Sequence, residues 1–204
     1  DMSHPALPWP PALVGTPAVA VIERAIERSR LSHSLLLHGD DLGTLVGVAH
    51  AIADRLLNPP NAKSRFAVKD HPDYIALRPK GKSRIIPIGK SGSPDPGTMR
   101  EFLPKLYVTP AVAPRKVAIL YEADRMEPPS ANAFLKTLEE PPANTTLLLL
   151  TTRPYSMLPT ILSRVLHFRF PAAVAAPQAG GWTPWLADYR AWLDGLASGA
   201  VADK

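Results

Sequence analysis

Apolar residues follow two alternating patterns along the first 170 residues of the chain. In some stretches they recur every three or four positions, which is the spacing on the buried face of an amphipathic helix. Shorter stretches between these are mostly apolar without regular alternation, which is typical of strands buried on both faces of a sheet. The expected helices span residues 17–30, 44–57, 98–106 and 131–140, and the expected strands span residues 34–38, 74–78, 116–121, 145–151 and 166–170.

The order of these elements predicts an α/β fold, with a five-stranded parallel sheet covered by helices on both faces. In such a fold the loops that follow the strands share one edge of the sheet, and ligands bind at that edge. The loop after the first strand is therefore the first candidate for a functional site.

That loop lacks the residues of a phosphate-binding loop. Such a loop needs glycines for close backbone approach, a Lys for the outer phosphates and a Ser or Thr for magnesium. Leu45 stands at the Lys position and Val46 at the hydroxyl position, and two acidic residues would repel a polyphosphate. The residues alone favour a structural loop over a nucleotide site. The degenerate loop consists of Gly39, Asp40, Asp41, Leu42, Gly43, Thr44, Leu45 and Val46.

The end of the third expected strand also departs from a nucleotide hydrolase. In such an enzyme an Asp at this point holds magnesium, and a neighbouring Glu polarises the attacking water. Tyr121 takes the first position and, as a neutral phenol, cannot hold the metal. Glu122 keeps the second position, but a base without metal or nucleotide has nothing to act upon. We interpret Glu122 as a partly solvated carboxylate at a strand end.

Positive charge is concentrated in one segment. The net formal charge is +5, and residues 78–90 contain five basic side chains and no acidic one. Within this segment Lys80, Lys82 and Arg84 are candidate contacts to nucleic-acid phosphates. The absence of interleaved aromatic residues favours the alternative of a solvated loop. Because Gly, Ser, Pro and like charges offer little to bury, we also expect residues 81–94 to be mobile.

Several classes of protein are excluded by composition. The chain contains no cysteine, which excludes a disulfide scaffold, a thiolate zinc site and a cysteine nucleophile. No apolar run is long enough to span a membrane, and no secretory signal pattern is present. We therefore expect a cytoplasmic protein without membrane association. Residues 171–181 have the composition of a linker, and residues 182–196 predict one amphipathic helix.

Three motifs in the second half of the chain are long and specific. They are AFLKTLEEPP at residues 133–142, LTTRP at residues 150–154 and LPTILSR at residues 158–164. Together with His71-Pro72-Asp73, they resemble the clamp-loader ATPases of bacterial replication, over roughly residues 14–170. The resemblance implies the AAA+ fold, in which a small helical lid follows the five-stranded sheet. It therefore implies a core domain at residues 1–170, with a linker and partial lid at residues 171–204.

Both candidate nucleotide-binding elements are degenerate while Ser163-Arg164 is retained, and this combination resembles the delta-prime class of clamp-loader subunits. The resemblance implies that Arg164, with Ser163 in the same motif, is an arginine finger for a neighbour's ATP site. It also implies that Thr151 and Thr152 correspond to the family's sensor region. Neither ATP nor a metal nor another cofactor is expected in this chain's own site. The implied partners are ATPase subunits of the gamma/tau type, a delta-type subunit and, indirectly, the sliding clamp and primed DNA.

The chain departs from that family in two respects. The family commonly has four zinc-binding cysteines before the His-Pro-Asp triplet, and it has a C-terminal collar domain; this sequence shows neither. Two other functions stay open at this point. One is a catalytically active ATPase subunit of the gamma/tau type, and the other is a DNA-binding module that uses residues 78–90.

Overall fold

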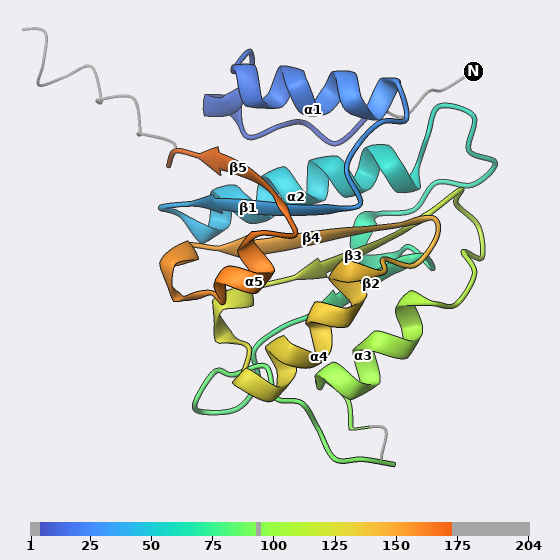
Figure 1. Ribbon diagram of the computed structural model, residues 1–204. Coiled ribbons are helices and arrows are strands. Elements are labelled where there is room, and N and C mark those ends of the chain that lie inside the picture. The colour runs from blue at the N-terminus through green and yellow to red at the C-terminus, as the bar shows by residue number, and fades with distance from the viewer. Residues whose placement is uncertain (1–4, 93–94, 173–204) are drawn as a thin grey trace, which may run out of the picture. The chain divides into compact units, whose positions relative to one another are not determined.

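The computed structural model describes residues 5–92 and 95–172 of the chain. Its centre is a parallel sheet with the strand order β2-β3-β4-β1-β5 (Figure 1). The strands are β1 (Ser34–Gly39), β2 (Tyr74–Leu77), β3 (Lys116–Leu120), β4 (Thr145–Thr151) and β5 (Leu166–Phe170). The predicted α/β fold with a five-stranded parallel sheet is confirmed.

Helices cover both faces of this sheet. On one face lie α1 (Pro17–Glu27) and α2 (Leu42–Leu57), and on the other lie α3 (Met99–Leu106) and α4 (Pro128–Glu139) (Figure 1). The short helix α5 (Pro159–Leu162) lies between β4 and β5, and the 3-10 helices are η1 (Pro11–Leu13), η2 (Val68–Asp70), η3 (Ala123–Arg125) and η4 (Pro154–Ser156). In the described parts of the chain, no helix has the length and apolar character needed to cross a membrane.

Successive residues of the central strands pack into two separate clusters of buried side chains. Leu35 and Leu37 of β1 belong to the cluster that includes α1 and α2, whereas Leu36 belongs to the cluster that includes α3 and α4. In β4, Leu148 belongs to the cluster with α1 and α2, and Leu147 belongs to the cluster with α3 and α4. Burial on both faces explains why these strands show no alternation of polar and apolar residues.

The basic segment after β2 is anchored at its middle, so the prediction of a mobile stretch over residues 81–94 is wrong for that part. Ile86 is fully buried, and its backbone forms a bridge with Met126. The Ile86 N–H donates to the Arg125 carbonyl at 2.8 Å, and the Glu127 N–H donates to the Ile86 carbonyl at 3.1 Å. Ile88 packs against the same cluster, so the short apolar run 85–88 was the signal that the basic residues on both sides obscured. Residues 93 and 94 lie outside the described residues.

The predicted linker and partial lid fall almost wholly outside the described residues, since the description ends at Ala172. The division into a core at residues 1–170 and a lid region at residues 171–204 stays a prediction.

The buried carboxylate of Asp73 joins β2 to the loop that leads into β3. It accepts hydrogen bonds from the backbone N–H groups of Ala111, Val112 and Ala113, at 2.6, 2.8 and 2.7 Å. Burial by itself raises the pKa of Asp73, but these three bonds outweigh burial, and the pKa lies below its usual value. The triplet His71-Pro72-Asp73 therefore has a structural role in holding this loop.

We predict that Asp73→Asn destabilises the fold by about 2 kcal/mol or more, because hydrogen bonds to a charged acceptor are worth about 1.5–3 kcal/mol each. Since the folded state lowers the Asp73 pKa, the contribution is fully present above the pKa of an unfolded aspartate. It is lost as the pH falls through the lowered value. Urea unfolding from pH 7 to pH 2 measures both effects. The wild-type protein should lose more stability on acidification than the variant does.

The matched control is Asp70→Asn, which removes a nearby exposed carboxylate and should change stability by less than about 0.5 kcal/mol. Equal stability of Asp73→Asn and the wild-type protein at pH 7 would contradict the proposed structural role.

Candidate functional site

The first turn of α2 is capped by the chain's own carboxylate. Asp41 Oδ2 accepts a hydrogen bond from the Thr44 N–H at 2.8 Å and another from Thr44 Oγ1 at 2.7 Å. These bonds lower the pKa of Asp41, with the Thr44 hydroxyl as the largest contributor. A phosphate-binding loop uses the free amides and positive dipole at this helix end to hold an anion. Here a side-chain anion already occupies that position, and it explains why α2 begins at Leu42 rather than at Thr44.

The remaining loop residues take part in packing. Leu45 is fully buried in the cluster that includes α1 and α2, and Val46 packs against the same cluster. A Cβ atom on Gly39 would lie 2.0 Å from the Phe170 carbonyl oxygen, so this glycine permits β5 to approach β1. Asp40 lies 3.5 Å from an Arg169 nitrogen in an exposed ion pair. No side chain of the loop presents a cation to a phosphate.

Tyr121 lies at the centre of a hydrogen-bonded group on the α2 side of the sheet. Its hydroxyl lies 2.7 Å from the Tyr74 hydroxyl and 2.7 Å from His50 Nε2. The guanidinium carbon of Arg78 lies 3.9 Å from the centroid of the Tyr121 ring. Burial, with the Tyr74 hydrogen bond, raises the pKa of Tyr121, and burial lowers the pKa of His50. Tyr121 is therefore a neutral phenol at neutral pH, and it fills the position of a magnesium ligand.

The sequence did not reveal the partners of Tyr121. His50 and Tyr121 are 71 positions apart, and Tyr74 and Tyr121 are 47 apart. The one available signal was His50, a polar residue within the apolar pattern of α2. A histidine at that position is consistent with many hydrogen-bond partners.

Two groups that the sequence placed in different sites form an ion pair with each other. Glu122, with a left-handed φ of 50°, binds the guanidinium of Arg84. Lys80 Nζ lies 3.3 Å from Asp95 Oδ2 and donates to the Pro96 carbonyl at 3.0 Å. Lys82 is exposed. The structure therefore gives the candidate base Glu122 and the candidate DNA contacts Lys80 and Arg84 partners within the chain.

Thr151 joins the end of β4 to η3. Its hydroxyl donates to Asp124 Oδ1 at 2.7 Å and accepts from the Arg153 N–H at 2.9 Å. Thr151 is fully buried, whereas Thr152 is exposed. The two residues that resemble a sensor region thus lie at the same edge of the sheet as the degenerate loop.

Arg164 lies at the other edge of the sheet, where the parallel strands begin. It precedes β5, which pairs with β1 in a register that places Leu166 opposite Leu35. Gly39, where the degenerate loop begins, lies four residues further along β1, which is about 13 Å of strand. Because β1 and β5 are parallel, the loop after β1 lies where the two strands end, and the turn before β5 lies where they begin. Arg164 is therefore directed away from the chain's own loop.

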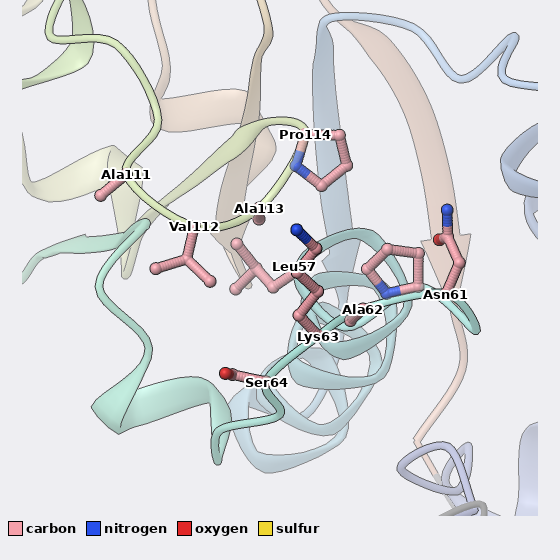
Figure 2. Close-up of a pocket in the computed structure, with 10 residues that line it drawn as sticks. Leu57, Asn61, Ala62, Lys63, Ser64, Ala111, Val112, Ala113 and Pro114 are labelled. Atoms are coloured by element: carbon pink, nitrogen blue, oxygen red, sulfur yellow. The ribbon is translucent and has the colours of Figure 1, made fainter.

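Two hollows, each of about 510 Å³, adjoin α2. One lies at the start of the helix, between the segment Leu7–Pro11 and the residues from Asp41 to His50. The other lies at the end of the helix, between Leu57 and the loop 111–114, and contains Lys63 as its ionisable lining residue (Figure 2). In the described residues no group of His, Asp and Glu side chains is arranged to hold a metal ion.

A family model described as "DNA polymerase III, delta subunit" matches residues 15–173 of the chain. Over 170 residues the chain is 31% identical to the DNA polymerase III delta' subunit of Pseudomonas aeruginosa. This alignment covers 78% of this chain and 48% of that protein. Over 103 residues it is 38% identical to the delta' subunit of Escherichia coli strain K12, and this alignment covers 50% of this chain and 28% of that protein. The chain spans about half or less of the length of these curated relatives.

Solved structures share the fold. A DNA polymerase III gamma subunit-related protein from Thermotoga maritima matches with a TM-score of 0.54 at 28% identity, over 73% of this chain and 45% of that chain. A RuvB mutant from the same organism matches with a TM-score of 0.51 at 15% identity, over 81% and 48%. Together with the strand order, these similarities identify the fold as AAA+.

Restoring the missing lysine should damage the fold instead of creating a nucleotide site. Leu45→Lys places an ammonium group among buried apolar side chains, and we expect a loss of about 3 kcal/mol or more in the free energy of unfolding. Leu45→Met conserves the volume and should cost less than about 1.5 kcal/mol. Thermal unfolding and a Mg-ATP titration are the measurements. A Leu45→Lys protein with wild-type stability and micromolar ATP affinity would show that the loop is an intact nucleotide site.

Proposed function

The chain belongs to the family of DNA polymerase III delta-prime subunits, and from this premise we propose that it is a clamp-loader subunit with no ATPase activity of its own. In this proposal it supplies Arg164 as an arginine finger to the ATP site of a neighbouring ATPase subunit. The hydrogen bonds from Thr44 to the Asp41 carboxylate carry the first part, because they occupy the anion-binding end of α2. The position of Arg164 at the other edge of the sheet supports the second part.

The chemistry of phosphoryl transfer explains why an Arg would be useful there. Negative charge spreads over the γ-phosphate oxygens in the transition state, and a guanidinium from a second subunit stabilises it. Arg stays ionised and donates to two phosphate oxygens at once. The proposed partners are ATPase subunits of the gamma/tau type and a delta-type subunit. Their assembly would load the sliding clamp onto primed DNA in the cytoplasm, where a bacterial chromosome is replicated.

The two rival functions have less support. An active ATPase subunit needs a cation and a hydroxyl in the loop, where this chain has Leu45 and Val46. A DNA-binding module at residues 78–90 needs free basic side chains, and two of its three candidates, Lys80 and Arg84, are held by carboxylates of this chain.

We predict no micromolar binding of Mg-ATP to this chain. The Asp41 carboxylate repels phosphate and occupies the Thr44 amide, and Tyr121 offers no metal ligand. Isothermal titration calorimetry is the measurement, and the partner ATPase subunit titrated under the same conditions is the positive control. A dissociation constant in the micromolar range for this chain would overturn the first part of the proposal.

We predict that Arg164→Ala leaves this domain folded, because a half-exposed ion pair contributes about 1 kcal/mol or less. In the assembled clamp loader the same variant should lower the kcat of ATP hydrolysis by the neighbouring subunit. Arginine fingers are worth about 10³ to 10⁵ in rate, so a partial effect should also be measurable. Arg164→Lys should be nearly as damaging, since a point charge does not reproduce the forked contact.

The measurement is steady-state ATPase activity of the complex reconstituted with the ATPase subunits of the same organism. Arg169→Ala is the matched control, because it removes an exposed Arg that pairs with Asp40 at the other end of β5. If Arg164→Ala complexes assemble and hydrolyse ATP at the wild-type rate, the finger role is refuted.

A further inference from the structure

The guanidinium of Arg164 is held in place from two sides. Within its own turn, Nη1 donates to the Thr160 carbonyl at 2.7 Å and to Ser163 Oγ at 3.3 Å. From α4, Glu139 Oε1 lies 2.9 Å from Nη2. The side chains of Arg164 and Glu139 are 34% and 46% exposed, so the pair is accessible from solvent.

These contacts leave part of the guanidinium available. A guanidinium has five N–H donors. The two hydrogen bonds use two of them, and the contact with Glu139 is an ion pair at Nη2, so donors remain for a forked contact to a phosphate. The arrangement restricts the orientation of a long side chain without using all of its donors.

Glu139 is the contact that comes from a different element. Thr160 and Ser163 lie in the same turn as Arg164, so they move with it. Glu139 is the last residue of α4, and it therefore fixes the guanidinium relative to the body of the domain.

A negatively charged Glu139 at the C-terminal end of α4 is electrostatically unfavourable unless a cation lies beside it. The carbonyl end of a helix carries partial negative charge and favours Lys, Arg or His over an acidic residue. Glu139 ends the helix, and Glu140 follows it as the cap. The Arg164 guanidinium neutralises Glu139 and lies beside the carbonyl end of α4, which gives the acidic residue a reason to be there.

We propose that Glu139 is a positioning residue for Arg164, which it holds in the orientation that a neighbour's ATP requires. This inference rests on the proposed function, because it assumes that Arg164 acts in trans. Preorganisation of a reacting group avoids the cost of ordering it in each catalytic cycle, and a misplacement of about 1 Å can cost about a hundredfold in rate. A finger that is already oriented should therefore act mainly on kcat rather than on the KM for ATP.

The test uses steady-state ATPase activity of the reconstituted clamp loader. Glu139→Ala should lower kcat about tenfold, which lies within the cost of about a hundredfold that a misplacement of about 1 Å can have. The KM for ATP should change less than twofold. Glu139→Gln keeps an acceptor oxygen at the same position and should retain activity within about threefold of wild type. Glu140→Ala is the matched control, because it removes an adjacent exposed charge from the same helix end, and it should behave as wild type.

A double-mutant comparison separates positioning from a general effect on folding. If Glu139 acts through Arg164, then Glu139→Ala should have no further effect in an Arg164→Ala background. An effect that persists in that background overturns the inference, and so does a Glu139→Ala complex that is as fast as wild type or faster. Both results would leave the finger role intact if Arg164→Ala alone is slow. A wild-type rate for Arg164→Ala would refute the finger role, and the inference with it.

Discussion

The hydrogen bonds between the Asp41 carboxylate and Thr44 are the interaction on which our proposal for this domain depends. In a phosphate-binding loop the start of the helix after the first strand is left open for an anion. In this chain a short acidic side chain caps the Thr44 amide, which stabilises the start of the helix without a ligand. The fold keeps the geometry of a nucleotide-binding domain, but its anion site is satisfied from within.

The rest of the nucleotide edge follows the same principle. The buried leucine Leu45 fills the core where a lysine would reach out, and Tyr121 shares hydrogen bonds with His50 and Tyr74 where a carboxylate would hold magnesium. Glu122 is neutralised by Arg84. Asp41, Tyr121 and Glu122 at this edge each have a partner in the same chain. In our proposal this edge is a structural surface, and Arg164, at the other edge, is the group that acts on a neighbouring subunit.

Much of this could be predicted from the sequence, because strand and helix periodicity and the loop residues are local signals. The leucine runs in β1 and β4 predicted two-sided burial, which the structure confirms. The loss of nucleotide chemistry indicated by Leu45, Val46 and Tyr121 stays a prediction. The sequence also predicted Asp41 as a source of repulsion, but not as a helix cap.

Contacts between distant residues could not be predicted in the same way. Arg84 and Glu122 are 38 positions apart, and in the sequence they belong to different motifs. Ile86 lies in the short apolar run 85–88 between basic residues, and its burial accompanies the backbone bridge to Met126. The pair between Glu139 and Arg164 requires the C-terminal end of α4 to meet the turn before β5, which is a property of the assembled sheet.

The most direct test of this account is the distribution of a photoreactive ATP analogue among the subunits of the assembled clamp loader. We expect the label on the ATPase subunits and not on this chain, because Asp41 already occupies the anion-binding end of α2. Labelling of this chain within residues 39–46, competed by unlabelled Mg-ATP, would contradict it.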